Sequence, residues 1–483
     1  MRTGLSFLGI AAALTAASPM LAQQPDRGGP PELGPPPRLR LPAAQEFTLS
    51  NGLRVMLLEK HQVPVVQVNL VVEAGAGNEA ADRMGLASLV ADMMDEGAGE
   101  RDALALADAI DFLGVRLSVR AGTHTMMVSL FTPASRLSDA LPLMADVALR
   151  PTFPADELER KRTSRLTQLL QWHDEPSAVA DVLFNKALYG TTHPYGFSSL
   201  GTEASIRAVT VEDLRVFHRA YVRPNNAFVV VVGDVTPAAI QERLERAFGS
   251  WEPGRIPAPR WPQAQQVRGR RILLVDKPGA AQSEIVIGRI GVTRKTDDYY
   301  ALQVMNTILG GSFTSRLNDN LRERNGYSYG AGSGFSYDLL PGPFQASSAV
   351  QTDATDKALR EFFNEFRGIR EPIADDELQR GKNYVALRYP GQFQSVGSIA
   401  GALDDLYVYD LPEDYLSQYV DRILAVSPRD VMRVARQYID PDNMLIVVVG
   451  DRAKVEAGIR ALNLGAVEVL SIEDVLGPKP VLD

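Results

Sequence analysis

The histidines of this chain are too far apart to form a metal site on one helix. The sequence contains five of them, and no two lie within ten residues of each other: His61, His124, His173, His193 and His218. Two imidazoles that bind one ion from a helix need a spacing of about four residues, so that they share a face. The chain also has no cysteine, which excludes thiolate ligands and disulfides. The sequence therefore predicts no zinc site built from histidine or cysteine.

Arg322 and Tyr329 have side chains that can stabilise a negatively charged intermediate. The stretch "TSRLNDNLRERNG", residues 314–326, has the pattern of a helix that ends at a left-handed glycine. The stretch "YSYGAGSGFSY", residues 327–337, has the pattern of a strand. Arg322 and Tyr329 would then lie at one helix-to-strand corner, where a guanidinium and a phenol can donate hydrogen bonds to an oxyanion. The alternative is a surface ion pair for Arg322 and a core position for Tyr329.

The elements that position such residues occur twice in the chain. The stretch "VTVEDLRVFHRAYVRPNNAFVVVVGDV" begins at Val209, and the similar stretch "VSPRDVMRVARQYIDPDNMLIVVVGDR" begins 217 residues later at Val426. Each copy has a Thr or Ser that caps an amphipathic helix, then a turn with proline and asparagine, then an apolar strand. The simplest explanation is a tandem duplication of one α/β unit.

Strands and helices alternate in a mixed pattern within each copy. Strands are expected at residues 53–60, 65–75 and 117–132, and helices at 136–149 and 155–172. This pattern predicts an α+β fold with two tandem homologous halves, each a mostly antiparallel or mixed β-sheet covered by helices.

Composition shifts suggest the boundaries of the parts. Residues 1–22 have a basic start, an apolar run and a small-residue cleavage site, as in a secretory signal peptide; an uncleaved membrane anchor is the alternative. The proline-rich leader is expected at 23–45, the halves at 46–251 and 269–476, a proline-rich linker at 252–268 and a tail at 477–483. No second apolar span follows, so an exported, most simply periplasmic, protein is expected.

The charge of the chain argues against nucleic-acid binding. The formal net charge is −9, and the sequence contains no basic cluster of the kind that binds phosphate backbones.

Four further stretches resemble the pitrilysin/insulinase family of metallopeptidases. They are "LSNGLRV" from Leu49, "HPYGFSSLGTEASI" from His193, "YVRPNNAFVVVVGD" from Tyr221 and "LGGSFTSRLNDNLRERNGYSYG" from Leu309. The resemblance is strongest to the shorter class of this family, which includes the mitochondrial processing peptidase subunits and the core subunits of the cytochrome bc1 complex. It extends from Phe47 to about Leu476.

The resemblance implies a zinc helix whose ligands are replaced in this chain. Family members carry H-x-x-E-H on a helix, where the two histidines bind zinc and the glutamate acts as general base. A further glutamate follows roughly 76 residues later. Here the four positions hold Ser88, Ala91, Asp92 and Gln168. The resemblance therefore implies that the chain has kept the fold and has no metal site of its own.

The second functional element of the family is present. Active members use an Arg and a Tyr from the C-terminal half, in the pattern L-R-x-x-x-G-x-x-Y, to position substrate and stabilise the tetrahedral intermediate. Arg322 and Tyr329 fit this pattern. In a processing-peptidase subunit a longer glycine-rich loop handles substrate, and Gly310-Gly311 lie at the corresponding place. A plain turn is an equally good interpretation of this short loop.

These observations predict a catalytic half-site. In the shorter class, one chain can bring zinc while a related chain has lost zinc and keeps the Arg/Tyr pair. The resemblance thus implies a zinc-bearing partner subunit, extended peptides as substrates and no cofactor in this chain. The alternatives are a non-catalytic peptide-binding or scaffold protein of the same fold, and a peptidase that is active alone through an unrecognised site.

Overall fold

The computed structural model describes residues 34, 39, 41–259 and 261–482. The chain divides into a unit of residues 1–36 and a compact unit of residues 37–483, to which the following description refers. The predicted signal peptide and most of the predicted leader lie outside the described residues. None of the described helices is long and apolar enough to span a bilayer.

The N-terminal half contains one large sheet and a layer of helices. Its strands are β1 (Gln45–Thr48), β2 (Arg54–Glu59), β3 (Val65–Val72), β6 (Arg116–Ala121), β7 (Met126–Pro133) and β8 (Ala227–Gly233), with a small hairpin of β4 (Gly97–Ala98) and β5 (Arg101–Asp102). Its helices are α1 (Leu86–Met94), α2 (Ala103–Leu113), α3 (Leu137–Leu149), α4 (Ala155–Trp172), α5 (Pro176–Tyr189), α6 (Glu203–Ala208), α7 (Val211–Tyr221) and α8 (Pro237–Phe248).

The C-terminal half repeats this composition. Its strands are β9 (Arg271–Asp276), β10 (Gln282–Ile290), β11 (Gly332–Phe335), β12 (Pro343–Gln351), β13 (Leu445–Gly450) and β14 (Ala466–Leu470). Its helices are α9 (Tyr299–Leu309), α10 (Arg316–Asn318), α11 (Thr355–Gly368), α12 (Asp375–Arg388), α13 (Val396–Val408), α14 (Tyr415–Ala425), α15 (Pro428–Tyr438), α16 (Arg452–Ala461) and α17 (Ile472–Leu476); the π-helical turn η5 (Asp319–Arg324) follows α10 directly.

The two sheets share a five-strand order, which confirms the predicted duplication and fold class. The order is β1-β2-β8-β3-β7-β6 in the first sheet and β11-β12-β10-β13-β9-β14 in the second. Read from β2 and from β9, both contain one parallel pair and then three antiparallel pairings. The apolar strands β8 and β13 occupy equivalent central places. Only the sixth strand differs, because β1 precedes its sheet in the chain and is antiparallel, whereas β14 follows and is parallel.

The caps of the repeated helix form as the sequence predicts. Thr210 Oγ1 accepts the N–H of Asp213 at the start of α7, and Ser427 Oγ accepts the N–H of Asp430 at the start of α15, both at 3.2 Å. Each aspartate carboxylate in turn accepts the backbone N–H of the cap residue. At the start of each helix, two backbone N–H groups that have no partner within the helix thus receive a hydrogen-bond acceptor.

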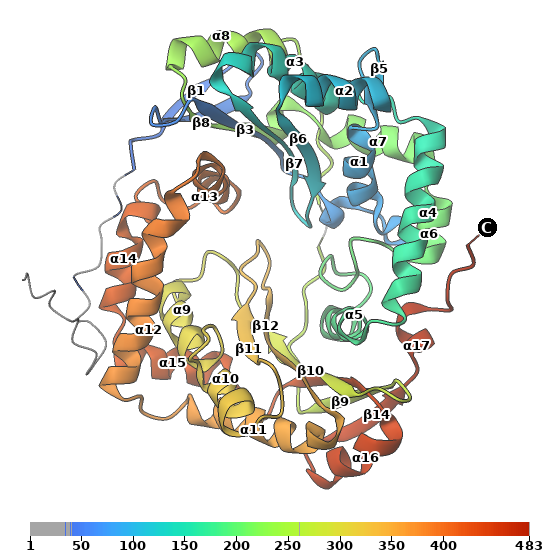
Figure 1. Ribbon diagram of the computed structural model, residues 1–483, viewed down its shortest axis with the longest axis vertical. Helices are drawn as coiled ribbons and strands as arrows, with labels where there is room; N and C mark the ends of the chain where they lie inside the picture. The colour runs from blue at the N-terminus through green and yellow to red at the C-terminus, as the bar shows by residue number, and fades with distance from the viewer. Residues whose placement is uncertain (1–33, 35–38, 40, 260, 483) are drawn as a thin grey trace, which may run out of the picture. The chain divides into compact units, whose positions relative to one another are not determined.

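Each half contributes one helix to the sheet of the other half. Helix α5, from the N-terminal half, packs on β10 and β13, whereas α13, from the C-terminal half, packs on β3 and β8 (Figure 1). On α5, Phe184 is fully buried and lies over Gly288 of the second sheet. On α13, Tyr407 stacks on Phe228 of the first sheet, with ring centres 4.6 Å apart. This helix exchange, in which α5 and α13 each pack on the sheet of the other half, covers a second face of the central strands β8 and β13 and explains why they are apolar on both faces.

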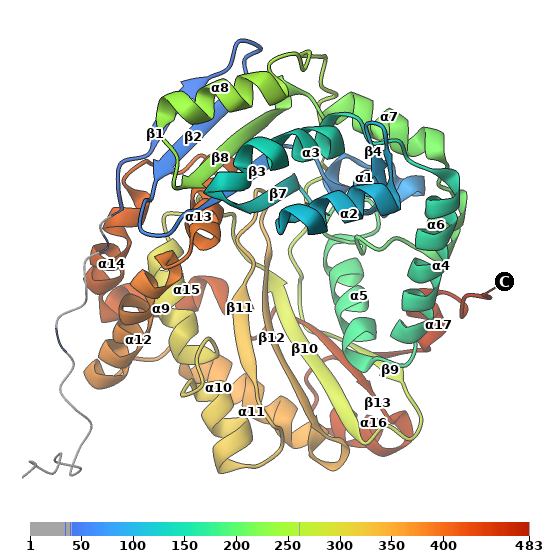
Figure 2. The same ribbon diagram turned by 45° about the horizontal axis from the view of Figure 1, so that its top comes forward.

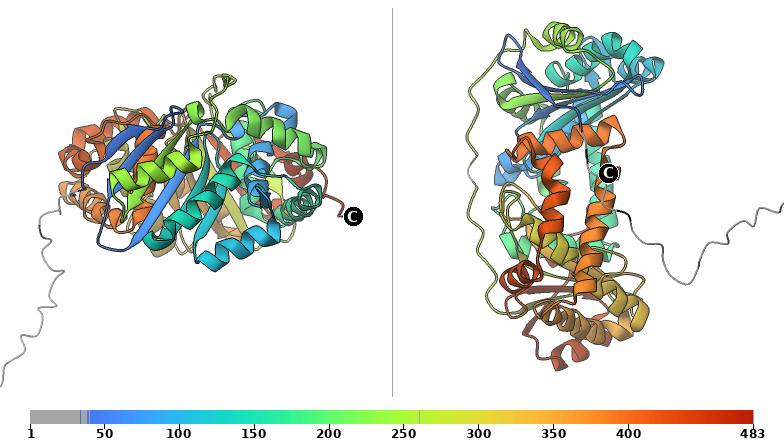
Figure 3. Two further views of the ribbon diagram at one scale, coloured as in Figure 1. Left: turned by 90° about the horizontal axis from the view of Figure 1, so that it is seen from above. Right: turned by 90° about the vertical axis from the view of Figure 1, so that its left-hand side faces the viewer.

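The opposite face of the first sheet carries α3 and α8 (Figure 2). The connection between the halves, residues 252–270, forms no helix or strand in its described part and runs in an extended path from one sheet to the other (Figure 3). Trp261 in this connection donates a hydrogen bond from Nε1 to the carbonyl of Gly77 at 2.8 Å.

Candidate functional site

Helix α1 carries three of the four positions where zinc chemistry would be expected. It begins after Gly85, whose φ of 87° is in the left-handed region, and a Cβ there would lie 2.6 Å from the carbonyl oxygen of Leu200. The carboxylate of Glu79 accepts the N–H groups of Gly85 and Ala87 at 2.8 and 2.6 Å. Burial raises the pKa of Glu79 to about 8, against these two N–H donors and the charge of Arg165. The first turn of α1 is therefore held by a side chain from the preceding loop.

Ser88 and Ala91 offer no ligand to a metal ion. The Ser88 hydroxyl lies 2.5 Å from the carbonyl oxygen of Ser199 and 3.1 Å from that of Gly85, and it can donate to either. Ala91 is buried and has no polar side-chain atom. The first ligand position is therefore used to join α1 to the loop around Ser199, and the general-base position is part of the core.

Asp92, at the second ligand position, is bound by a buried arginine. Arg165 Nη2 lies 2.5 Å from Asp92 Oδ2, and Arg165 Nη1 donates to the carbonyl of Gly85 at 3.0 Å. The Arg165 side chain is 7% exposed and that of Asp92 is 46% exposed. Arg165 lies on α4, one turn before the exposed Gln168, which holds the fourth position. A protein cation thus neutralises the carboxylate on the metal-binding face of α1.

The residues at these four positions do not fit a zinc ion. The oxygen atoms at these positions belong to the Ser88 hydroxyl, which bonds to the backbone, to the Asp92 carboxylate, which pairs with Arg165, and to the Gln168 amide. Zinc prefers imidazole, thiolate and free carboxylate ligands. The described part of the chain contains no group of three His, Asp or Glu residues that could hold a metal.

Arg165 was not found by the sequence reasoning. A signal for it exists: Arg165 and Gln168 are three residues apart on one helix, so they share a face. A basic residue on the same helix face as a replaced ligand position, such as Arg165 beside Gln168, predicts a positive side chain in the place where the metal ion would lie.

A polar pocket of about 590 Å³ lies next to this site, between the two halves. Ser198 and Ser199 line it near α1, and Trp172 lines it at the end of α4. Asp181 on α5 and Asp338 in the second half also line it, and burial raises the pKa of both carboxyls. The pocket thus places groups from both halves beside the face that has lost its metal ligands.

Arg322 and Tyr329 are brought together, as the sequence predicted, but on shorter elements than expected. The helix is α10 followed by the π-helical turn η5, and Gly326 ends it with a φ of 63°. The predicted strand 327–337 is wrong for its first half, because β11 covers only Gly332–Phe335. There the hydroxyl of Ser348 bonds to the carbonyl of Gly330, which replaces part of the expected strand ladder.

The guanidinium of Arg322 lies between two aromatic rings. Its Cζ is 5.2 Å from the ring centre of Tyr329 and 4.6 Å from that of Phe313. The Arg322 side chain is 30% exposed, and Nε lies 3.3 Å from Glu323 Oε1. Tyr329 is 87% exposed, so the core position considered for it is excluded. The expected surface ion pair is present as well, and it leaves the rest of the guanidinium accessible.

Gly310 and Gly311 are explained by close packing. A Cβ at Gly310 would lie 2.4 Å from the backbone N of Ser333, and one at Gly311 would lie 2.8 Å from Asn306 Nδ2. Both glycines therefore let the loop approach β11 and α9. This is a structural reason for the two residues, and their predicted role in substrate binding stays a prediction.

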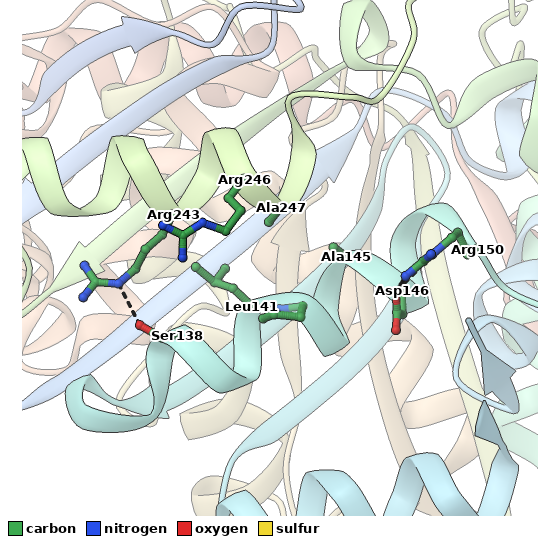
Figure 4. Close-up of a pocket in the computed structure, with 9 residues that line it drawn as sticks. Ser138, Leu141, Ala145, Asp146, Arg150, Arg243, Arg246 and Ala247 are labelled. Atoms are coloured by element: carbon green, nitrogen blue, oxygen red, sulfur yellow. Dashed lines mark hydrogen bonds and ion pairs between the residues drawn. The ribbon is translucent and has the colours of Figure 1, made fainter. Parts of the chain in front are cut away.

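A smaller cavity of about 170 Å³ lies far from these residues, between α3 and α8 (Figure 4). The arginines around it already have partners: Arg243 donates to Ser138, Arg150 pairs with Asp146, and Arg246 pairs with Glu242. The cavity has no geometric link to the candidate site.

Comparison with known proteins finds one peptidase family along both halves of the chain. A model of the insulinase family (peptidase family M16) matches residues 54–198, and a model of the peptidase M16 inactive domain matches residues 208–385. A crystal structure of a peptidase M16 inactive domain from Pseudomonas fluorescens aligns with a TM-score of 0.79 and 26% identity over 84% of this chain and 98% of that one.

Some curated proteins similar to this chain are named as proteases, and one is named as a non-peptidase homolog. An uncharacterized zinc protease, YmxG of Bacillus subtilis, is 23% identical over 84% of this chain and 98% of its own length. A non-peptidase homolog of Helicobacter pylori is 22% identical over 83% of this chain and 92% of its own. With the lost ligand positions and the Arg165–Asp92 pair, these matches identify the chain as a catalytically degenerate member of the insulinase (M16) peptidase family.

Proposed function

We propose that this chain is an exported, zinc-less subunit of a heterodimeric peptidase, and that it supplies Arg322 and Tyr329 to the active site of a zinc-bearing partner chain of the same family. The observation that carries the proposal is a difference between two groups of predicted site residues, the replaced metal positions on α1 and α4 and the Arg322–Tyr329 pair. In the first group, Asp92 is already paired with Arg165. In the other group, the Arg322 guanidinium lies against the exposed Tyr329 ring, and the Arg322 side chain is 30% exposed.

The proposed substrates are short, extended peptides enclosed between the two chains. A peptide can be held by adding a strand to a sheet edge, because the edge offers unpaired N–H and C=O groups. Strand β6 is such an edge: it pairs with β7 on one side only within the described residues. Its residues alternate between exposed and half-buried, so one face of an added peptide would contact the protein.

A second candidate is a non-catalytic peptide-binding or scaffold protein. It is favoured by the Helicobacter pylori relative, which is named a non-peptidase homolog. This candidate predicts peptide binding without any contribution of Arg322 to turnover. A peptidase that is active alone has no support from the donor set at Ser88, Asp92 and Gln168.

The test mixes the chain with a short-class member of the same family that carries an intact H-x-x-E-H motif, and follows cleavage of a quenched fluorescent peptide. We expect the isolated chain to hold no stoichiometric zinc by elemental analysis and to cleave nothing. In the mixture, Arg322→Ala or Tyr329→Phe should lower kcat/KM by about a hundredfold, the loss typical of a missing oxyanion donor. Arg324→Ala is the matched control, because Arg324 lies in the same turn and pairs with Asp319.

Three outcomes would contradict the proposal. Wild-type turnover by both variants would support the scaffold protein instead. One tightly held zinc per isolated chain, lost on Asp92→Ala, would support a peptidase active alone. For the proposed export, the mature protein should be recovered from the periplasm with a new N-terminus near residue 23, and recovery of full-length protein in the cytoplasm would contradict it.

A further inference from the structure

Phe313 is an exposed aromatic residue outside the L-R-x-x-x-G-x-x-Y pattern that contains Arg322 and Tyr329. Among the described residues of the C-terminal half, Phe313 and Tyr329 are the only exposed aromatic side chains, at 62% and 87%. Both contact the same cation, Arg322. Aromatic rings exposed to this extent lose only part of their contact with water on folding, so these contacts add little to the hydrophobic core. Their position therefore calls for an explanation other than packing.

The backbone around Phe313 is fixed by a buried asparagine. Asn318 donates from Nδ2 to the carbonyl of Phe313 at 2.7 Å, and its Oδ1 accepts the N–H of Ala331 at 3.2 Å. Asn318 is 5% exposed. One side chain thus ties the loop that carries Phe313 to the segment that carries Tyr329. The two rings are held next to Arg322 by backbone contacts, although the rings themselves lie in solvent.

Arg322 has unused hydrogen-bond donors. Its only ion pair within the described residues is the 3.3 Å contact of Nε with Glu323, and Nη1 and Nη2 donate to no described group. A guanidinium stacked on a ring keeps its donors in the plane, pointing away from the ring. The outer edge of Arg322 is therefore available to an oxygen atom of a ligand.

We propose that Phe313 is a positioning residue of the half-site, and that Phe313 and Tyr329 together orient the Arg322 guanidinium toward a backbone oxygen of an extended peptide. The inference rests on the proposed function of Arg322. It adds that the loop after Gly311 acts through its aromatic side chain. Without the ring of Phe313, the guanidinium keeps its charge and loses one of the two surfaces that define its orientation.

The first arm of the test uses the isolated chain. The resonance of Arg322 Hε, assigned by comparison with Arg322→Lys, should be shifted by the nearby rings. We expect Phe313→Leu to remove part of this shift and Phe313→Tyr to keep it. Phe112→Leu is the control, because Phe112 is 82% exposed and lies on α2, outside this cluster. An unchanged Arg322 resonance in Phe313→Leu would overturn the proposal.

The second arm measures peptide cleavage with the zinc-bearing partner. We expect Phe313→Leu to lower kcat about two- to fivefold, the size of one exposed cation–π contact, with KM and thermal stability unchanged. Phe313→Tyr and Phe112→Leu should retain the wild-type rate. A wild-type kcat for Phe313→Leu, with Arg322→Ala strongly impaired, would overturn only the role of Phe313. A wild-type kcat for Arg322→Ala would overturn this proposal together with the proposed function.

Discussion

Replacing Asp92 by alanine should destabilise the protein, because it leaves the buried Arg165 guanidinium without its counter-ion. Removing one partner of a fully buried ion pair lowers the free energy of unfolding by about 3–5 kcal/mol, because the other charge stays buried without a partner. Asp92 is 46% exposed, so water already screens part of the interaction. A hydrogen bond to a charged group is worth about 1.5–3 kcal/mol. We therefore expect Asp92→Ala to lower the free energy of unfolding by about 2 kcal/mol.

Arg165→Met should cost less than Asp92→Ala, although the arginine is the more buried residue. Methionine fills a similar volume and needs no counter-ion, and the freed carboxylate of Asp92 can be hydrated. The carbonyl of Gly85 loses the Arg165 donor and keeps the N–H of Leu89 at 3.0 Å. We expect a loss of about 1 kcal/mol for Arg165→Met, and nearly the same for the double variant, as is often found when a buried pair is replaced by apolar residues.

The assay is urea unfolding of the four proteins in a double-mutant cycle. The expected coupling between Asp92 and Arg165 is about 1.5–2 kcal/mol. High salt should weaken this coupling only in part, because the Arg165 guanidinium is buried whereas the Asp92 carboxylate is partly exposed. A coupling below about 0.5 kcal/mol, or a double variant less stable than Asp92→Ala, would refute the argument that Arg165 needs Asp92.

Two further predictions concern the contacts between the halves. Asp404 of α13 bonds to Asn69 of β3 at 2.6 Å, and burial raises its pKa to about 7. The unfolded chain loses this proton near pH 4, so stability should fall as the pH rises from about 4 to 7, by up to about 4 kcal/mol. Asp404→Asn should reduce the slope in urea unfolding from pH 4 to 8 by the share that Asp404 contributes, whereas the share of Glu79, whose pKa burial raises to about 8, should remain. An unchanged slope would exclude Asp404 as a source. Gly288→Ala should destabilise by about 1–3 kcal/mol, because its Cβ would lie 2.0 Å from the carbonyl oxygen of Phe344 and 2.8 Å from Phe184. Gly401→Ala, in open space on α13, should instead stabilise by about 0.5–1 kcal/mol; equal thermal midpoints for both would contradict the close packing at Gly288.

Local patterns were enough to predict the halves and their repeated elements. The apolar strands β8 and β13, the capped helices α7 and α15 and the glycine end at Gly326 all follow from neighbours in the sequence. The replaced ligand positions Ser88, Ala91 and Asp92 were identified through the resemblance to the family's H-x-x-E-H pattern, and helical spacing adds only that the three residues share a face of α1.

The remaining features depend on contacts between distant segments, which a single sequence does not reveal. The exchange of α5 and α13 joins residues of one half to the sheet of the other, and Arg165 meets Asp92 across 73 residues. The strand predicted over 327–337 is shortened because side chains take the place of backbone partners at Ala331 and Gly330. Asn318 Oδ1 accepts the N–H of Ala331, and the hydroxyl of Ser348, on the neighbouring strand β12, donates to the carbonyl of Gly330. Tertiary contacts of this kind override strand propensity.

The two groups of predicted site residues, Ser88 with Asp92 and Arg322 with Tyr329, differ in how much binding energy they can offer a ligand. A group that already has a partner gains little from a ligand, because one hydrogen bond is exchanged for another. Ser88 bonds to backbone and Asp92 binds Arg165, so the first group is satisfied within the chain. Arg322 keeps free donors between two exposed rings. A peptide or a partner chain would therefore gain more binding energy from Arg322 than from Ser88 or Asp92, which is the difference that the proposed half-site requires.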